Sequence, residues 1–172
     1  MARLRTREES ELEAATLAAL EPVRANGEVP ALYRQFAASE PALRAYLGME
    51  AAVREGSLAE REVEAVKLLV SVRLGCDFCT AVHTAKGRRA GLDARTQEAI
   101  RTRVAVGEPR LDALLDIVAT LLAHPGPLDD ERVRIARQAG VDDENLVDLT
   151  LLTATILFTN VTNHVNDTPP PR

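Results

Sequence analysis

The chain has no tryptophan, and aromatic residues make up only 3% of its 172 residues, although 46% are hydrophobic. With so few large rings, the core must be packed by Ala, Leu and Val, as in closely spaced helices. The alternating apolar and polar pattern of half-buried strands is also nearly absent. These absences favour an all-α fold.

Long apolar runs and clusters of positive charge are missing as well. No window approaches the ~18 consecutive apolar residues of a membrane span. Basic residues occur near the N-terminus, but the apolar segment of a secretory signal does not follow them. The net charge of -5 and the lack of a Lys/Arg run oppose binding to phosphate backbones. We therefore expect a cytoplasmic protein with no membrane and no nucleic acid as partner.

The length suits one domain with a hydrophobic core. We expect a single helical domain over residues 1–168, with its core motif at 58–92, and an extended or disordered tail at 169–172. Apolar spacing and Gly or Pro breakers, Pro125 among them, predict the helices. Their expected spans are 7–25, 30–38, 41–55, 59–74, 76–90, 94–105, 109–123, 130–139 and 143–165.

Several predicted helices have capping residues at their start. Ser57 with Glu60 fits a capping box, and N-caps are expected at Asp93, Asp129 and Asp142. Two segments, 65–74 and 146–161, are apolar on most helical faces. We expect them to lie at the centre of the fold or at an interface, so the sequence also favours a homo-oligomer.

Cysteine is scarce, since Cys76 and Cys79 are the only two in the chain. Two cysteines make a poor disulfide framework, and a cytoplasmic pair three residues apart is more typical of catalysis or metal binding. Gly75 precedes the pair and is a plausible break that places both thiols in the first turn of a helix. The N–H groups and macrodipole there favour thiolate, whereas the carboxylate of Asp77 opposes it.

His83 shares a helical face with both cysteines and could take or return the Cys79 proton. If the chain reverses near Gly75, Glu64 lies within an axial offset of about 4.5 Å from His83, which a Glu side chain can span. A hydrogen bond between them would fix the imidazole tautomer, as in a catalytic triad. Glu62 is the rival carboxylate, but we expect it on another face and solvated.

Less specific interpretations remain open for these residues. The thiols could be inert and buried, or Cys76, Cys79 and His83 could bind zinc, although a fourth ligand from Glu64 would be unusual for a structural site. His83 alone could be a hydrogen-bonded core residue, and Glu64 a first-turn carboxylate. Structural roles are expected for His124 and for His164 with its neighbours Asn160 and Asn163, and a solvated face for Lys86, Arg88 and Arg89.

Glu64, Cys76-x-x-Cys79-x-x-x-His83 and the stretch 84–92 resemble the signature of the alkylhydroperoxidase D-like (AhpD-like) branch of the carboxymuconolactone decarboxylase superfamily. The resemblance covers residues 58–92, and residues 157–167 resemble the closing segment of many members less specifically. The spacing of Glu, CxxC and His together is far more specific than CxxC alone.

The resemblance implies a compact multi-helix fold, with the CxxC at the N-terminus of a central helix, that assembles as trimers or hexamers. It also implies that Cys79 attacks the substrate, that Cys76 resolves the sulfenic acid, and that Glu64 and His83 relay protons. No bound cofactor or metal is implied. Electrons come from an external dithiol, and a lipoylated or peroxiredoxin protein is the suggested partner. Some members have a histidine where this chain has Phe78.

We therefore expect a thiol-disulfide oxidoreductase with alkyl hydroperoxide reductase activity, acting on a hydroperoxide or disulfide. The alternatives are a lactone-processing or decarboxylating enzyme, whose chemistry needs no cysteine pair, a redox sensor without turnover, and a metal-stabilised structural oligomer.

Overall fold

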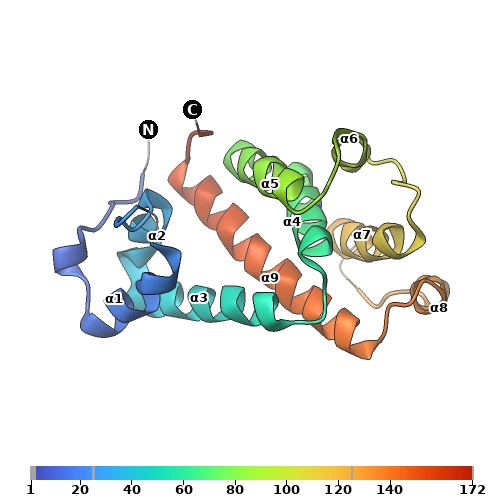
Figure 1. Ribbon diagram of the computed structural model, residues 1–172, viewed down its shortest axis with the longest axis horizontal. Coiled ribbons are helices and arrows are strands. Elements are labelled where there is room, and N and C mark those ends of the chain that lie inside the picture. Colours follow the sequence, from blue (N-terminus) through green and yellow to red (C-terminus); the bar gives the residue numbers. More distant parts are fainter. Residues whose placement is uncertain (1–2, 25, 125, 172) are drawn as a thin grey trace.

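The computed structural model describes residues 3–24, 26–124 and 126–171, which form helices and no β-strand (Figure 1). The all-α prediction is confirmed. Met1, Ala2, Ala25, Pro125 and Arg172 lie outside the described residues, and so do the predicted helix break at Pro125 and the end of the predicted tail at Arg172. The elements are η1 Glu9–Glu11, α1 Ala14–Leu20, η2 Glu21–Val23, α2 Ala31–Phe36, η3 Ala37–Ser39, α3 Glu40–Glu55, α4 Glu60–Leu74, α5 Asp77–Arg89, α6 Ala94–Thr102, α7 Pro109–Ala123, α8 Asp130–Gln138 and α9 Asp143–Asn166.

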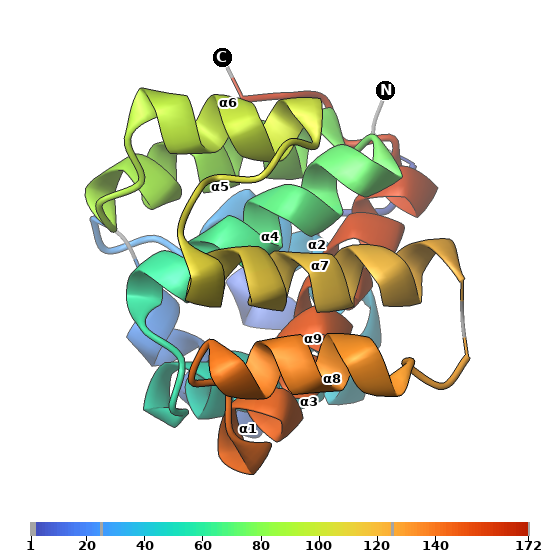
Figure 2. The same ribbon diagram turned by 90° about the vertical axis from the view of Figure 1, so that its right-hand side faces the viewer.

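Helix α4 occupies the centre of the molecule. It contacts α5, α6, α7 and α9, and Figure 2 shows it between α5 and α6 on one side and α7 on the other. All ten residues from Glu62 to Ser71 are buried. The prediction of a central position for the apolar segment 65–74 is therefore confirmed.

Helix α9 runs across the molecule and contacts α3, α4, α5 and α7 (Figure 1). By length and composition alone it could cross a membrane. Its residues Leu149, Leu152 and Ile156 are nevertheless buried in the protein core. Core helices pass the same test of length and composition, so this single candidate is weak evidence for a membrane span.

The prediction of one helix over 7–25 is wrong. The chain forms the 3₁₀ turn η1 and then the short helix α1, because Leu12 and Glu13 between them have extended backbones. After α1 the chain tightens into the 3₁₀ turn η2, which contains Pro22. Proline lacks the N–H that would continue an α-helix, so Pro22 helps to end it here.

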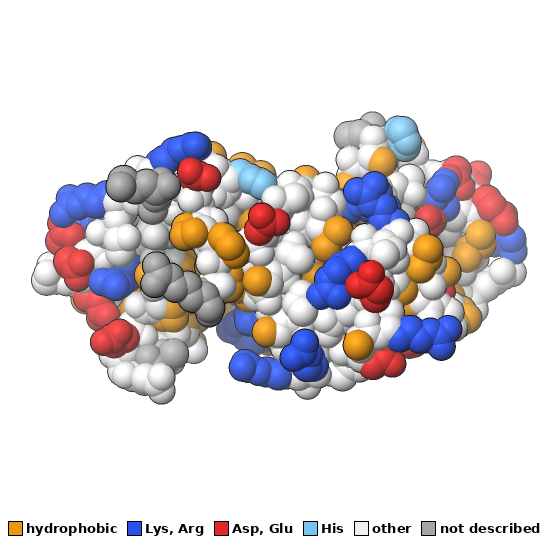
Figure 3. Space-filling view, turned by 90° about the horizontal axis from the view of Figure 1, so that it is seen from above, with side chains coloured by type: hydrophobic (Ala, Val, Ile, Leu, Met, Phe, Trp, Pro, Cys, Tyr) orange, Lys and Arg blue, Asp and Glu red, His pale blue; other side chains and the backbone are white. Residues whose placement is uncertain are grey.

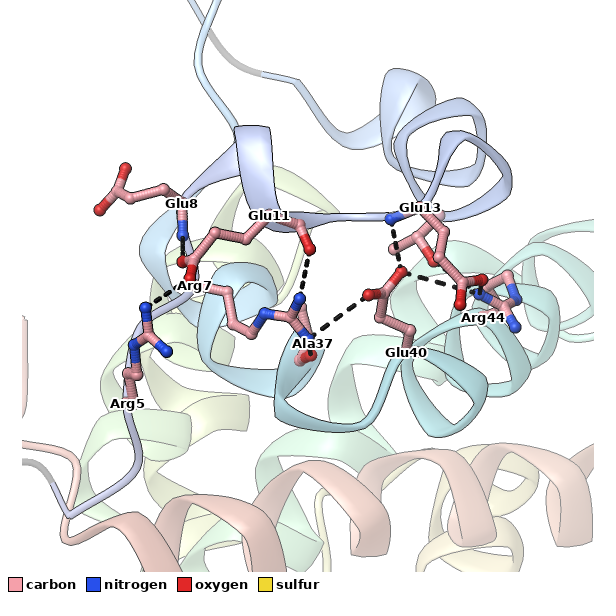
Figure 4. Close-up of polar contacts among 9 residues, drawn as sticks. Arg5, Arg7, Glu8, Glu11, Glu13, Ala37, Glu40 and Arg44 are labelled. Atoms are coloured by element: carbon pink, nitrogen blue, oxygen red, sulfur yellow. Dashed lines mark hydrogen bonds and ion pairs between the residues drawn. The ribbon is translucent and has the colours of Figure 1, made fainter.

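Ion pairs of Arg7 with Glu40 and of Glu13 with Arg44 hold this N-terminal segment against α3 (Figure 4). The buried carboxylate of Glu40 accepts a hydrogen bond of 2.9 Å from the backbone N–H of Glu13. It also lies 3.4 Å from Arg7 and 4.0 Å from Arg44. Tertiary contacts that no local pattern encodes therefore replace the expected helix.

The capping predictions have different outcomes. The N-caps Asp93, Asp129 and Asp142 are confirmed, since each carboxylate accepts a backbone N–H in the first turn. The capping box of Ser57 and Glu60 is wrong. Instead, α4 begins after Ala59, whose N–H donates to Glu62 over 3.0 Å, and Ser57 donates to Asp148.

The buried side chains form two clusters of different composition. The aliphatic cluster joins α4, α7 and α9 and consists of Leu, Val, Ile and Ala. The aromatic cluster joins α1, α2 and α3 and includes Phe36 and Tyr46, with Tyr33 and Phe158 packed against it. The rings of Tyr46 and Phe158 stack with their centroids 5.2 Å apart, and Phe36 meets both edge to face.

Candidate functional site

The turn between α4 and α5 places the two cysteines. Gly75 ends α4 in the left-handed region, with φ 69°, where glycine pays no steric penalty. Cys76 is the N-cap of α5, and Cys79 lies in its first turn. The chain reverses here and α5 packs back on α4, as the sequence interpretation required.

The carboxylate of Glu64 reaches His83 across this helix pair. Oε2 of Glu64 lies 2.8 Å from Nδ1 of His83, and both side chains are 8% exposed. The predicted juxtaposition is confirmed. Glu62 lies elsewhere, as expected, but it is buried rather than solvated, because it accepts hydrogen bonds from Arg110 and from the N–H of Ala59.

Glu64 and His83 form a pair in which a carboxylate lies beside a neutral imidazole. Burial disfavours the charge of Glu64, but the hydrogen bond from His83 and the positive charges of Lys67 and Lys86 outweigh it, so the pKa of Glu64 lies below its usual value. Burial also lowers the pKa of His83, against the opposing effect of Glu64. We infer that Nδ1–H donates to Glu64. The second nitrogen, Nε2, is then the one that can accept a proton.

Both cysteines are free thiols, with Cys76 4% and Cys79 1% exposed. The backbone N–H of Cys79 lies 3.3 Å from Sγ of Cys76. A hydrogen bond from the Cys79 thiol, together with that N–H, lowers the pKa of Cys76 to about 7. The same thiol contact and burial raise the pKa of Cys79. In the reduced protein, Cys76 is therefore the more acidic thiol and Cys79 retains the proton.

Asn163 of α9 contacts the second cysteine, a role that sequence reasoning missed. Its Nδ2 donates to Sγ of Cys79 over 3.3 Å, and this hydrogen bond favours the thiolate of Cys79. Oδ1 of Asn163 is buried without a partner among the described residues. The sequence showed only that an Asn lies late in the final helix. The structural role expected of His164 agrees with its contact of 3.0 Å to the carbonyl oxygen of Leu74.

A small cavity of about 50 Å³, here called the inner pocket, lies against Cys79 and His83. Phe78 also lines it, whereas Cys76 is not among the lining residues. Val82 and Lys86 of the same helix, α5, line the inner pocket too. The remaining lining residues come from α2, α3, α4 and α9 and are Leu32, Tyr33, Tyr46, Glu50, Lys67, Ile156 and Thr159.

The zinc interpretation gains no geometric support. Within residues 3–24, 26–124 and 126–171, no group of three His, Cys, Asp or Glu side chains is arranged to hold a metal ion. The carboxylate of Glu64, the fourth ligand considered, is engaged by His83.

The carboxymuconolactone decarboxylase family model matches residues 40–124, which include the whole helix pair and the four predicted site residues. No curated protein sequence matches the chain significantly. The class of protein to which residues 40–124 are similar is therefore the carboxymuconolactone decarboxylase family.

Solved structures agree with this class. A protein from Ralstonia eutropha JMP134, described as an alkylhydroperoxidase AhpD core and an uncharacterised peroxidase-related protein, has a TM-score of 0.85 and 21% identity, covering 99% of this chain and 92% of that one. An uncharacterised peroxidase-related protein from Silicibacter sp. TM1040 has a TM-score of 0.80 and 22% identity, covering 98% and 90%. Residues 40–124 thus match the carboxymuconolactone decarboxylase family, and the solved structures show that the chain as a whole has the AhpD-like fold.

The same fold also supports a different reaction. A cysteine-to-alanine variant of the debrominase Bmp8, solved with 2,3,4-tribromopyrrole, has a TM-score of 0.72 and 16% identity, covering 93% of this chain and 89% of that one. Such a likeness concerns the fold alone. The activity of this chain must therefore be argued from its own residues.

Proposed function

We propose that this protein is a thiol-dependent hydroperoxide reductase whose disulfide is reset by an external dithiol. The observation that supports it best is the Glu64–His83 hydrogen bond of 2.8 Å next to a pocket lined by Cys79. A buried neutral imidazole oriented by a carboxylate is suited to general-base catalysis. A thiol facing the same pocket supplies the nucleophile.

Cys79 is the attacking thiol in this proposal, because it lines the inner pocket and Cys76 does not. His83 takes the proton of Cys79 at Nε2, and Asn163 stabilises the resulting thiolate. The sulfur attacks the terminal oxygen of the hydroperoxide and the O–O bond breaks. His83 returns its proton to the departing alkoxide. Cys79 is oxidised to a sulfenic acid, and the hydroperoxide is reduced to an alcohol.

Cys76 then resolves the sulfenic acid. Its lowered pKa, about 7, means that much of it is already thiolate at neutral pH. The thiolate attacks the sulfur of Cys79, and hydroxide leaves and takes up a proton from solvent to form water. An external dithiol reduces the new disulfide by two thiol-disulfide exchanges and becomes a disulfide itself.

Partners and assembly are part of the proposal. The AhpD-like relationship suggests a lipoyl group on a partner protein, or a peroxiredoxin, as the redox partner, and a cytoplasmic setting would supply reduced dithiols. Val147, Val161 and Val165 are exposed along α9, which supports association with further copies of the chain. Light scattering of the purified protein would measure the subunit number.

Peroxide consumption with a dithiol reductant tests the activity. We expect wild-type turnover and a loss of at least 1000-fold in Cys79→Ser, because the nucleophile is removed. His83→Ala should lose about 100-fold through loss of the general base. Turnover by Cys79→Ser at the wild-type rate would refute the mechanism.

The same variants separate the alternatives. A lactone-processing or decarboxylating enzyme would retain its activity in Cys79→Ser, since that chemistry needs no thiol. A redox sensor would form the Cys76–Cys79 disulfide once, without repeated consumption of peroxide. A metal-stabilised oligomer would contain stoichiometric metal, and its thiols would resist titration.

A further inference from the structure

A second and larger cavity adjoins the inner pocket. It measures about 600 Å³ and shares Glu50, Lys67 and Lys86 with the inner pocket, so the two are neighbours. We call it the outer cavity. Its other lining residues are Val53, Arg54, Leu58, Glu60, Val63, Glu64 and Arg89. The proposed reaction of the thiols assigns no role to the outer cavity.

The inner pocket and the outer cavity have room for different parts of a substrate. The inner pocket, at about 50 Å³, has room for one or two water molecules or a peroxide group, and none for an organic body. The outer cavity, at about 600 Å³, is within the usual size of small-molecule sites. The outer cavity is the neighbouring space that has room for the organic part of a hydroperoxide whose O–O group lies against Cys79.

The outer cavity has more cations than anions once the side chains that pair with one another are set aside. Lys67 is only 4% exposed, and its Nζ lies 2.9 and 3.0 Å from the two carboxylate oxygens of Glu50, so this pair is satisfied internally. Glu64 is likewise engaged by His83. The remaining charged side chains are three cations and one anion: Arg54, Lys86, Arg89 and Glu60.

The three cations have no hydrogen-bonded or ion-paired partner in the part of the chain that the structure describes. Many arginines elsewhere do have one, as in the pairs Arg61–Glu108 and Arg110–Glu62. The chain has only two lysines, Lys67 and Lys86, and both line this cavity. Figure 3 shows Lys and Arg side chains gathered beside a notch in the surface of this otherwise acidic protein.

The cavity is also partly apolar, through Val53, Leu58 and Val63. A ligand that satisfies both parts carries an anionic group for the cations and a hydrocarbon body for the aliphatic wall. We propose that the outer cavity binds the carboxylate of an amphipathic organic acid, whose hydroperoxide group extends into the inner pocket toward Cys79. The substrate class is thus a carboxylate-bearing organic hydroperoxide. The kinetic part of this inference rests on the proposed peroxidase function.

A matched pair of substrates isolates the carboxylate. Cumene hydroperoxide with a para carboxylate and the methyl ester of the same compound share the peroxide and the hydrocarbon body. We expect the wild-type protein to show a kcat/KM at least tenfold higher for the acid, mainly through KM. In the double variant Arg54→Gln/Arg89→Gln, this acid-to-ester preference should fall about tenfold, because two favourable charges are lost.

Arg88→Gln is the control variant. Arg88 is exposed, precedes Arg89 in α5 and is not among the residues lining the outer cavity. Its substitution removes one positive charge from the protein surface, half of what the double variant removes, and should leave the acid-to-ester preference unchanged. Equal preference for acid and ester in the wild-type protein would overturn the inference, and so would an equal loss in Arg88→Gln.

A binding measurement keeps this test independent of turnover. The tertiary alcohols formed from the two hydroperoxides are redox-inert and can be titrated into the protein by calorimetry. The carboxylate alcohol should bind at least tenfold more tightly than its methyl ester, and the double variant should abolish this difference. If neither hydroperoxide is consumed, the proposed function fails while the titration still decides the cavity's ligand. Equal binding of both alcohols would overturn the inference.

Discussion

The aliphatic and aromatic clusters differ in what they contribute to the site. The aliphatic cluster holds α4 in place among α7 and α9, and α4 carries Glu64. The aromatic cluster contributes Tyr33 and Tyr46 to the wall of the inner pocket, to which the aliphatic cluster contributes Ile156. The comparison teaches that the aliphatic cluster positions the helix that carries Glu64, whereas the aromatic cluster mainly helps to enclose the inner pocket.

The largest expected effect tests the aliphatic side of this division. Glu64→Gln should lower kcat/KM by up to about 100-fold, the loss expected of His83→Ala, because Glu64 acts through His83 and an amide orients its Nδ1–H less well than a carboxylate. Glu62→Gln is the matched control from the same helix, since its carboxylate bonds Arg110 and the N–H of Ala59. It should keep turnover within about twofold. Equal losses in both variants would contradict the assignment of Glu64.

The contribution of the aromatic cluster is tested by measuring the free energy of unfolding. Tyr46 is buried, stacks on Phe158 and meets Phe36 edge to face. Tyr46→Ala should lower the free energy of unfolding by about 3 kcal/mol, as other large-to-small changes in cores do. Denaturant titration measures it, with Leu68→Ala as the equivalent change in the aliphatic cluster. A change below about 1 kcal/mol in Tyr46→Ala would show that the aromatic cluster contributes little to folding.

The thiol pair gives a prediction on pH. In the reduced protein, the thiolate absorbance in the far ultraviolet should rise with pH around a midpoint near 7, the pKa of Cys76. Below this pH, Cys76 is protonated and resolution of the sulfenic acid slows. Cys79→Ala removes the thiol donor and should move the midpoint upward toward the ordinary cysteine range. An unchanged midpoint in Cys79→Ala would show that the Cys79 thiol does not lower the pKa of Cys76.

The smallest expected effect concerns the hydrogen bond from Asn163 of α9 to the sulfur of Cys79. Asn163→Ala should lower kcat about tenfold and move the alkaline limb of its pH profile, because one hydrogen bond to the Cys79 sulfur is lost. Asn160 is the control, since it is also buried in α9 but donates to the carbonyl of Ile156 and toward Ser71 instead. Asn160→Ala should not move the pH profile. The same shift in both variants would mean that Asn163 acts only through packing.

Local patterns accounted for much of the fold, and they failed at identifiable places. The N-caps at Asp93 and Asp129 depend on a few neighbouring residues, so they could be predicted. The helix expected over 7–25 could not be excluded, because its competitor is a set of contacts with Glu40, far along the chain. The capping box at Ser57 failed for the same reason, since Asp148 of α9 engages that hydroxyl.

The amino-acid sequence by itself determined the chemistry of the helix pair. Helical rise and a glycine turn fix the alignment of Glu64 with His83, and their spacing from Cys76 and Cys79 is local. Only the tertiary structure decided which sulfur faces a pocket, that Asn163 bonds to it, and that Lys67 and Arg54 line the adjoining cavity. These features depend on how separate helices pack, and packing is set by side-chain shapes across the whole core rather than by any short segment.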